Sequence, residues 1–266
     1  MPFDLVGFGE ASPGANGKLA ALLLDTLYKT NLDDLFIKEQ APWLLGVGCF
    51  GEATLGLTKL QQPSMPIDYE ILKGALLSSD DPMLGFTDMR GRPLPLVPKE
   101  KLNVEVVNAG DEDGITFLML GSAKITKAML DAVNPTHRII GYADTTLTAF
   151  TWGALTMTWN QDLPAGRYAV VGMKYGYFLA SPASAMPSAA RLVFKEPHSA
   201  GWRPGVIGCE MAADHEELQG SPEHDIHDWP LMTNMNFASD NLPGVEAVSA
   251  EGTNNQEIEL LLQKIA

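Results

Sequence analysis

Apolar and polar residues alternate along residues 154–160, in the stretch "ALTMTWN". A period of two residues is typical of a strand with one buried face, so this segment predicts a half-buried strand. Its two faces are Leu155, Met157 and Trp159 on one side and Thr156, Thr158 and Asn160 on the other. Pro164 and Gly166 then predict a turn, and the apolar run at 168–173 predicts a strand that returns beside the first.

A second pair of strands is predicted within residues 101–121, "KLNVEVVNAGDEDGITFLMLG". Two apolar runs, the first rich in valine, flank a cluster of Asn, Gly and Asp, which is the pattern of a hairpin with a polar loop. The loop carries Asp111, Glu112 and Asp113. These carboxylates lack the spaced oxygen ligands and the closing Glu of a helix-loop-helix calcium site, so we interpret them as a solvated turn.

The remaining segments are short and are separated by 18 prolines and 25 glycines spread along the chain. Further strands are predicted at 43–50, 54–60, 138–142, 146–151, 191–194 and 206–209. Helices are predicted at 17–36, 68–79 and 126–135, the last ending at Asn134 and Pro135. These helices are too few and irregular to alternate with strands in βαβ units.

The pattern therefore predicts an all-β protein, a β-sandwich of jelly-roll type with a few decorating helices. About a dozen strand candidates lie between the eight of one jelly roll and the roughly sixteen of two. A single jelly roll with insertions and a double one both remain open. We treat 1–266 as one jelly-roll domain that can divide into an N-terminal lobe, 1–135, and a C-terminal lobe, 136–266.

Composition changes this picture in one respect, the choice of partner. Hydrophobic residues make up 45% of the chain, which is ordinary for a globular protein, while 33 acidic against 18 basic residues give a net charge of -15. Binding to a phosphate backbone needs clustered Lys and Arg, so no direct nucleic-acid binding is expected. The longest aliphatic run, 19–24, is far short of the roughly 18 residues that span a bilayer. No signal peptide is evident, and we expect a soluble protein made in the cytoplasm.

The most enzyme-like motif is "GVGCFG" at 46–51, a formal G-x-G-x-x-G with Asp68 at about the distance of a ribose-binding acid. A dinucleotide site needs a strand before the glycines and a helix after them. Pro42 leaves only a short preceding strand, and the following segment is broken by Gly56 and ended by Pro63. We therefore interpret the glycines as part of a strand edge or tight bend.

Histidines offer a second candidate chemistry. His215, His224 and His227 lie among six carboxylates in 214–229, a composition that can bind a divalent metal. The segment is polar and contains a proline, with no predicted strand or helix to orient the imidazoles. We interpret it as a solvated loop, with metal binding left as an open alternative.

The turn at Pro164, Ala165 and Gly166 resembles the P-x-G turn of metal-binding cupins, but Ala169 stands where that family has a histidine ligand. The stretch "LGSAK" at 120–124 lacks the last glycine of a nucleophile elbow. Two cysteines, Cys49 and Cys209, are far apart in the sequence, and we interpret both as buried thiols. We interpret the turn at Arg203, Pro204 and Gly205 as the start of a strand. We therefore expect no catalytic, cofactor-binding or metal-binding residues, no cofactor and no enzyme.

The last half of the chain carries a resemblance to a known family. A Thr- and Trp-rich strand, "LPAGRYAVVGM", "ARLVFKEP" and "GWRPGVIG" within 147–209, together with 236–265, resemble the jelly-roll major capsid proteins of tailless icosahedral phages. The resemblance implies a structural virion protein, made in the host cytoplasm, that assembles with copies of itself and other virion proteins. With the acidic charge, it implies that another protein or an inner membrane faces the genome.

The alternative function is a jelly-roll carbohydrate- or ligand-binding module, which uses exposed aromatic residues in a concave face. Five tryptophans and six tyrosines are available for either an interface or such a face, although aromatic residues also fill cores. An enzyme that uses 46–51 or the histidine segment is the third interpretation.

Overall fold

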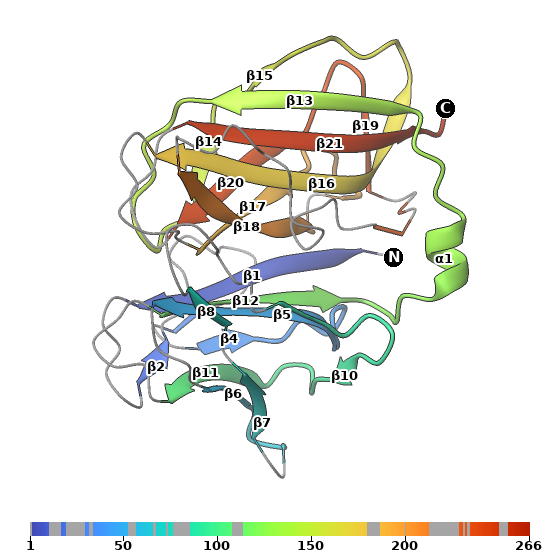
Figure 1. The fold of residues 1–266 in the computed structure, drawn as a ribbon. Helices are drawn as coiled ribbons and strands as arrows, with labels where there is room; N and C mark the ends of the chain where they lie inside the picture. Colours follow the sequence, from blue (N-terminus) through green and yellow to red (C-terminus); the bar gives the residue numbers. More distant parts are fainter. Residues whose placement is uncertain are drawn as a thin grey trace.

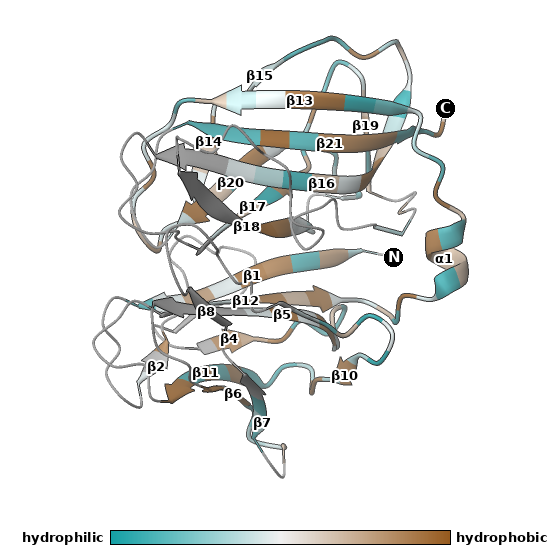
Figure 2. Ribbon diagram, in the orientation of Figure 1, coloured by the Kyte–Doolittle hydropathy of each residue, from teal (hydrophilic) through white to brown (hydrophobic). Residues whose placement is uncertain are grey.

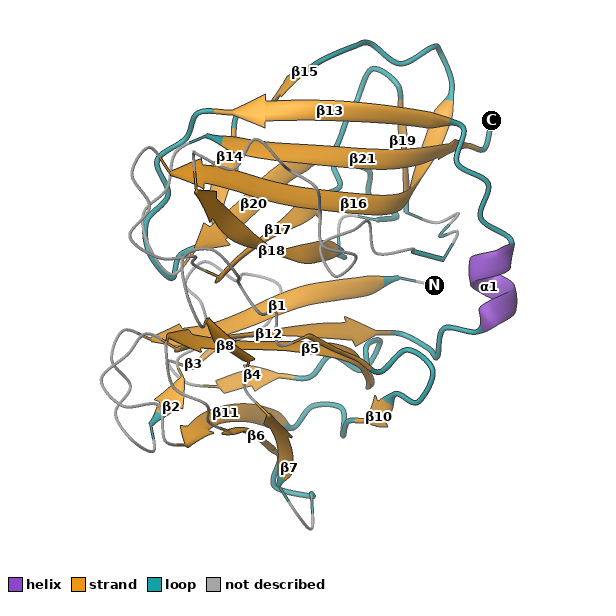
Figure 3. Cartoon of the chain, viewed as in Figure 1, coloured by secondary structure: helices purple, strands orange, loops and turns teal. Residues whose placement is uncertain are grey.

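The computed structural model describes residues 2–10, 17–19, 30–31, 34–52, 57–65, 68–72, 74–76, 86–107, 114–179, 187–199, 201–212, 229–230, 232, 235–249 and 255–266. The regular secondary structure of this part is almost entirely strand, with one short helix, α1 (Lys127–Asp131) (Figure 3). The prediction of an all-β protein is confirmed. No helix in the described part is long and apolar enough to cross a lipid bilayer.

Strands up to residue 121, here called the N-terminal half, pair among themselves in two sheets. The N-inner sheet has the order β1-β12-β5, with three short strands on the far side of β5. Its strands are β1 (Phe3–Glu10), β12 (Gly114–Gly121), β5 (Trp43–Glu52), β8 (Gly74–Leu76), β9 (Phe86–Asp88) and β10 (Leu94–Pro95).

The N-outer sheet has the order β3-β4-β11-β6-β7, and β2 also pairs with β11. Its strands are β2 (Lys18–Leu19), β3 (Thr30–Asn31), β4 (Asp34–Phe36), β6 (Leu57–Gln61), β7 (Tyr69–Leu72) and β11 (Lys101–Val107). Every second side chain of β11 is buried, because successive side chains of a strand point to opposite faces and one face of β11 lies against the N-inner sheet.

Strands from residue 137 onward, the C-terminal half, form a nine-stranded path that is folded into two layers. The C-outer sheet has the order β15-β13-β21-β16, with β19 also on β16. The C-inner sheet has the order β14-β20-β17-β18. The two are joined where the end of β16 runs parallel to the end of β18.

The C-terminal strands are longer than most of those in the N-terminal half. They are β13 (His137–Ala143), β14 (Gly153–Leu155), β15 (Thr158–Trp159), β16 (Arg167–Leu179), β17 (Pro187–Val193), β18 (Gly205–Ala212), β19 (Asn236–Ala238), β20 (Gly244–Ser249) and β21 (Gln256–Lys264). Figure 2 shows hydrophobic and hydrophilic residues alternating along β21, as expected for a strand that covers a core with one face.

The two halves order their main strands in the same way. In each half the first, last and third main strands are neighbours, as β1-β12-β5 and as β13-β21-β16. The second, next-to-last, fourth and fifth are also neighbours, as β2-β11-β6-β7 and as β14-β20-β17-β18. Figure 1 shows the four sheets stacked in the order N-outer, N-inner, C-inner and C-outer, with α1 beside the stack where the chain passes between the halves.

Each half has an apolar core between its two sheets, and the core cluster of the C-terminal half extends to buried residues of the N-inner sheet. The core of the N-terminal half includes Val6, Leu44, Leu118, Leu60 and Val104. The core of the C-terminal half includes Ile139, Tyr168, Leu260, Leu192 and Val245. Burial of these alternating side chains is the main force that holds the sheets of each half face to face.

Both predicted hairpins are wrong in their pairing. The segments at 101–107 and 114–121 are strands, but β11 lies in the N-outer sheet and β12 in the N-inner sheet. The segment 154–160 forms two short strands, β14 and β15, and neither of them pairs with β16. The chain changes sheets between β11 and β12 and between β14 and β15, and β15 is separated from β16 by β13 and β21 within the C-outer sheet. A sequence pattern instead favours pairing of neighbours in the chain.

Of the remaining strand and helix predictions, some are confirmed and others are wrong. Strands are confirmed at 43–50, 138–142, 191–193 and 206–209, and at 57–60 within the predicted 54–60, whereas most of 146–151 is loop and turn. The helix predicted at 126–135 is confirmed only at 127–131, as α1, and the helix ends before the predicted stop at Asn134 and Pro135. The helix at 68–79 is wrong because β7 and β8 occupy it, and the described parts of 17–36 are strand. Tertiary pairing overrides the helical propensity of these Leu- and Ala-containing segments.

Candidate functional site

The corner at Pro164 and Gly166 closes the C-terminal half. The hydroxyl of Tyr168 donates a hydrogen bond to Pro164 O at 2.7 Å, and the backbone N–H of Arg167 donates to Ala266 O at 2.8 Å. Gly166 has a φ of 155°, and a Cβ built on it would lie 2.6 Å from Ala266 O. The corner therefore anchors the end of the chain by close backbone packing.

Ala169, at the position of the cupin-type ligand, is fully buried in β16. It lies opposite Asn236 on one side and Gln263 on the other. Its methyl group belongs to the packed strand, so the corner provides a scaffold and no ligand for a metal.

The glycine-rich stretch 46–51 lies inside β5, a central strand of the N-inner sheet, so the predicted strand edge or bend is wrong. The next described element is another strand, β6. Asp68 accepts a hydrogen bond from Gln61 Nε2 at 3.0 Å. The strand and helix that would hold a pyrophosphate are therefore not arranged around these glycines, and Asp68 is engaged elsewhere.

Several sequence candidates lie outside the described residues. These are the histidines His215, His224 and His227 and the acidic triplet Asp111, Glu112 and Asp113. Cys49 and Cys209 lie in β5 and β18, and their side chains are also outside the description. Among the residues whose side chains are described, no three His, Cys, Asp or Glu side chains come together to hold a metal.

The turn at Arg203, Pro204 and Gly205 leads into β18 as predicted. It also lies where the two halves meet. Leu5 of β1 donates its backbone N–H to Arg203 O at 2.9 Å, and Arg203 donates its own N–H to Asp4 Oδ1 at 2.6 Å. The turn therefore links the halves through backbone hydrogen bonds.

Apolar side chains of the N-inner and C-inner sheets pack against each other in the same region, here called the seam. The ring of Trp152 lies edge-on to Phe117 of β12, with 6.4 Å between their centroids. The apolar part of the seam includes Leu5, Ile115 and Phe117 from the N-terminal half and Trp152, Ala189, Ile207 and Val248 from the C-terminal half. Phe3, Leu45 and Met119 of the N-inner sheet also join the core cluster of the C-terminal half.

Two groups of ion pairs meet at the seam, and together we call them the seam network: Lys38 with Asp4 in the N-terminal half, and Arg203, Glu246 and Arg191 in the C-terminal half. The hydrogen bond from Arg203 N to Asp4 Oδ1 joins the two groups across the seam. Asp4 is fully buried and lies 3.0 Å from Lys38 Nζ. Glu246 Oε2 lies 2.9 Å from Arg203 Nη1 and 2.8 Å from Arg191 Nε. Because each charge has an opposite neighbour, the network is suited to fixing an interface rather than to proton transfer.

Arg191 is the most buried cation of this network, with 1% of its surface exposed. Its guanidinium carbon lies 3.9 Å from the ring centroid of Trp152, and Nη1 donates to Leu5 O at 3.3 Å. A flat cation held between an aromatic face, a carboxylate and a backbone carbonyl is fixed in position. Arg191 therefore connects both inner sheets.

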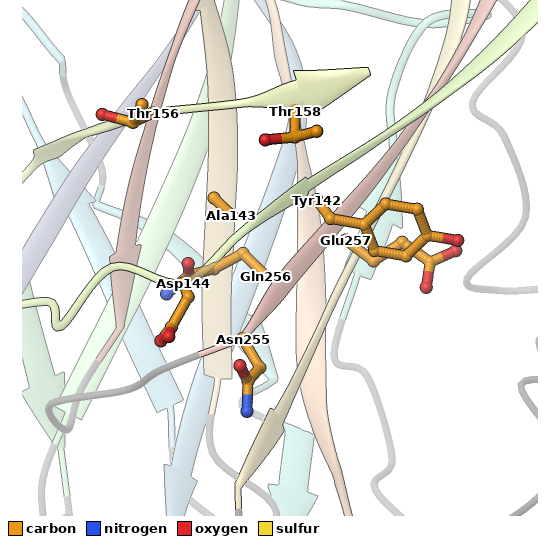
Figure 4. A pocket seen from close by; sticks show the side chains of 8 residues that line it. All are labelled: Tyr142, Ala143, Asp144, Thr156, Thr158, Asn255, Gln256 and Glu257. Atoms are coloured by element: carbon orange, nitrogen blue, oxygen red, sulfur yellow. The ribbon is translucent and has the colours of Figure 1, made fainter. Parts of the chain in front are cut away.

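A second feature, which the sequence did not reveal, is a hollow of about 510 Å³ at one end of the C-outer sheet. Figure 4 shows that its side chains come from the end of β13, from β15 and the residues before it, and from the start of β21. The lining residues are Tyr142, Ala143, Asp144, Thr156, Thr158, Asn255, Gln256 and Glu257.

Strand register brings three of these side chains to one face. Tyr142 is opposite Glu257 of β21 and opposite Thr158 of β15. Directly opposed residues project from the same side of a sheet, so Tyr142 has a glutamate and a threonine as its neighbours on the two adjacent strands. Tyr142 is 51% exposed, the most exposed large apolar side chain in the described part of the chain.

The floor of the hollow is held by Gln256, which is 1% exposed. Its Nε2 donates to Thr145 O at 2.7 Å, and its Oε1 accepts from Thr145 N at 3.3 Å. Burial raises the pKa of Glu257 above the usual range, with a further contribution from the nearby Glu259. The hollow thus has a fixed floor, an accessible aromatic ring and a rim of hydrogen-bonding groups.

Comparison with known proteins identifies no relative: no family model, curated protein or solved structure matches this chain.

Proposed function

We propose that each half is a jelly roll and that the chain is a self-assembling coat subunit of an icosahedral virion shell. The observation that carries the proposal is the strand order, which is repeated in the two halves. An order in which the first strand pairs with the last, and the second with the next to last, is that of the double-sheet jelly roll found in viral capsid and lectin domains. The boundary then falls at α1, close to the predicted division into 1–135 and 136–266.

The packing of the halves supports self-association. The N-terminal half uses its β1-β12-β5 sheet in the seam, whereas the C-terminal half uses its β14-β20-β17-β18 sheet. The contact is therefore heterologous, because the two units use different faces. The counterparts of those faces, the N-outer and C-outer sheets, stay at the two ends of the stack (Figure 1).

Heterologous contacts between like units close into rings or continue as open arrays. A second copy that placed its C-outer sheet on the N-outer sheet of the first would repeat the relation already present at the seam. A coat subunit needs such repeated contacts and a rigid body. Hydrogen bonds that cross the seam, from Arg203 N to Asp4 Oδ1, from Leu5 N to Arg203 O and from Arg191 Nη1 to Leu5 O, support a rigid body. No catalytic residue is required.

The net charge of -15 bears on the remaining partners. A chain this acidic does not offset the charge of nucleic acid, so the proposal places another virion protein or an inner membrane between this subunit and the genome. Density for nucleic acid packed directly against the subunit in an assembled particle would contradict this part of the proposal.

Mass photometry and negative-stain microscopy of the purified full-length chain test the proposal. We expect closed oligomers or larger particles that grow with protein concentration. The variant Lys59→Glu places a third carboxylate opposite Glu70 and Glu105 on the N-outer sheet, so it should weaken assembly at least tenfold. Lys127→Glu, on the exposed face of α1, is the matched control.

One observation favours the alternative, a carbohydrate- or ligand-binding module: the hollow around Tyr142. A module with that single role has no need of copies of itself. A monomer at every concentration, unaffected by Lys59→Glu, would overturn the coat proposal and leave this alternative.

A further inference from the structure

We infer that the hollow around Tyr142 is a binding site for a neutral saccharide. This inference stands on the geometry of the hollow and does not depend on whether the chain assembles into a coat.

The size and shape of the hollow suit a small ligand. Its volume of about 510 Å³ lies within the roughly 300–1,000 Å³ of ligand sites. Its residues come from the ends of β13, β15 and β21, which are tied together by the ladder pairs of Tyr142 with Glu257 and with Thr158. The site is therefore built on strands and is largely formed before any ligand binds.

Tyr142 supplies the apolar contact. The C–H groups of a pyranose ring form a flat apolar face, and an accessible aromatic ring is the surface that such a face covers best. The phenol is 51% exposed and is flanked by strands on both sides. A ring exposed to this degree gains buried area when a ligand packs on it.

The rim supplies partners for hydroxyl groups. Thr156 and Thr158 offer hydroxyls, Asn255 offers an amide, and Asp144 and Glu257 offer carboxyl oxygens (Figure 4). Gln256 is engaged with Thr145 and acts as a support. Figure 4 shows the ring of Tyr142 beside Glu257 at one side of the lining, with Asp144, Asn255 and Thr156 at the other. An aromatic ring at one side and donors and acceptors at the other match a molecule that has both a C–H face and hydroxyl groups.

Other classes of ligand fit less well. Asp144 and Glu257 would repel a phosphate or another anion, and they leave a cation site with too few fixed protein oxygens, since no cluster of three metal-ligating side chains exists in the described part. A purely apolar ligand would bury the carboxyl and hydroxyl groups without partners. A neutral polyhydroxylated ring satisfies both parts of the lining.

Saturation-transfer NMR with the full-length chain tests the inference. The probes are glucose, galactose, mannose, N-acetylglucosamine and the β-linked disaccharides cellobiose, lactose and chitobiose, each at millimolar concentration. We expect transfer to at least one of them, with the dissociation constant then measured by calorimetry. Tyr142→Ala should weaken binding more than tenfold, whereas Tyr142→Phe should change it less than threefold because the ring face remains.

Two further variants make the result specific to the hollow. Thr158→Val removes a hydroxyl opposite Tyr142 and should weaken binding several-fold. Val97→Ala, at the other well-exposed apolar side chain, should leave it unchanged. No transfer to any saccharide, transfer that persists in Tyr142→Ala, or binding of calcium in place of sugar would overturn the inference. Particle size, measured on the same samples, reports separately on the coat proposal.

Discussion

The N-terminal and C-terminal halves share an order of strands but differ in how they are held. To the polar contacts of the seam the N-terminal half contributes one buried carboxylate, one lysine and the backbone of β1, whereas the C-terminal half contributes Arg191, Arg203 and Glu246. The C-terminal half also closes its own corner through Tyr168 and the chain end. In the N-terminal half, the strand that corresponds to β16 is β5. It begins with Trp43 and Leu44, so it has no tyrosine at the position of Tyr168.

The difference between the halves shows that the strand order within a half and the stability of the contact between the halves depend on different residues. Alternating apolar residues specify a sandwich in both halves, as the similar cores indicate. Individual polar contacts, which are not repeated, fix how the sandwiches sit on each other. Substitutions at the seam should therefore lower the free energy of unfolding more than substitutions of similar chemistry at exposed sites. The following variants measure this difference.

The largest effect is expected for Arg191→Met. The substitution keeps an unbranched side chain but removes the cation that pairs with Glu246 and lies on Trp152. Breaking a buried pair typically costs about 3–5 kcal/mol, and since Glu246 keeps Arg203 we expect about 3 kcal/mol in the free energy of unfolding. Denaturant titration followed by tryptophan fluorescence measures it.

Arg138→Met is the matched control, because Arg138 also pairs with a glutamate, Glu259, but its side chain is 61% exposed. Exposed pairs contribute at most about 1 kcal/mol. Equal decreases in the free energy of unfolding of the two variants would mean that burial at the seam does not increase the contribution of Arg191 to stability.

A smaller effect is expected for Gly205→Ala, at the start of β18. A Cβ there would overlap the carbonyl oxygen of Ala190 and lie 2.8 Å from Arg191 Cβ. Crowding of a packed site of this kind costs about 1–3 kcal/mol. Gly201→Ala, in the same connection, meets no atom within 4 Å and should change the free energy of unfolding by less than about 0.5 kcal/mol.

The sequence predicted individual strands better than their partners. Alternation located β11 and β13, which are half-buried, and continuous apolar runs located β5, β12 and β16, which are buried on both faces over most of their described length. Pairing is not local: β11 and β12 are consecutive in the chain but belong to opposite sheets. Both predicted hairpins failed for that reason.

The candidate sites were still less predictable. The lining of the hollow comes from three separate segments, 142–144, 156–158 and 255–257, and only the register of β13, β15 and β21 joins them. In the sequence Tyr142 is one aromatic residue in a strand. Arg191 likewise has the local context of a surface arginine, and its burial follows from the stacking of two sandwiches.

A third variant, Tyr168→Phe, isolates the corner of the C-terminal half. The change removes only the hydroxyl that donates to Pro164 O and leaves that carbonyl without this partner. A hydrogen bond of this kind contributes about 1 kcal/mol. Thermal unfolding should show the loss, and Tyr142→Phe, at an exposed phenol, should not. An unchanged melting temperature in Tyr168→Phe would mean that this hydrogen bond does not stabilise the C-terminal half.

The smallest effect is expected for Glu257→Gln, at a half-buried carboxyl group in the lining of the hollow. Because burial and then Glu259 raise the pKa of Glu257, the folded protein holds this proton at a pH where the unfolded chain has lost it. The ionised group therefore destabilises the fold, fully so above the raised pKa, and this penalty disappears as pH falls below the ordinary value of 4.5. Glu257→Gln should be slightly more stable than the parent at pH 7 and equal to it near pH 4, in contrast to Arg191→Met, which should be less stable at both. A Glu257→Gln advantage that grows on acidification would reverse the sign of this linkage and show that the carboxylate is favoured in the folded state.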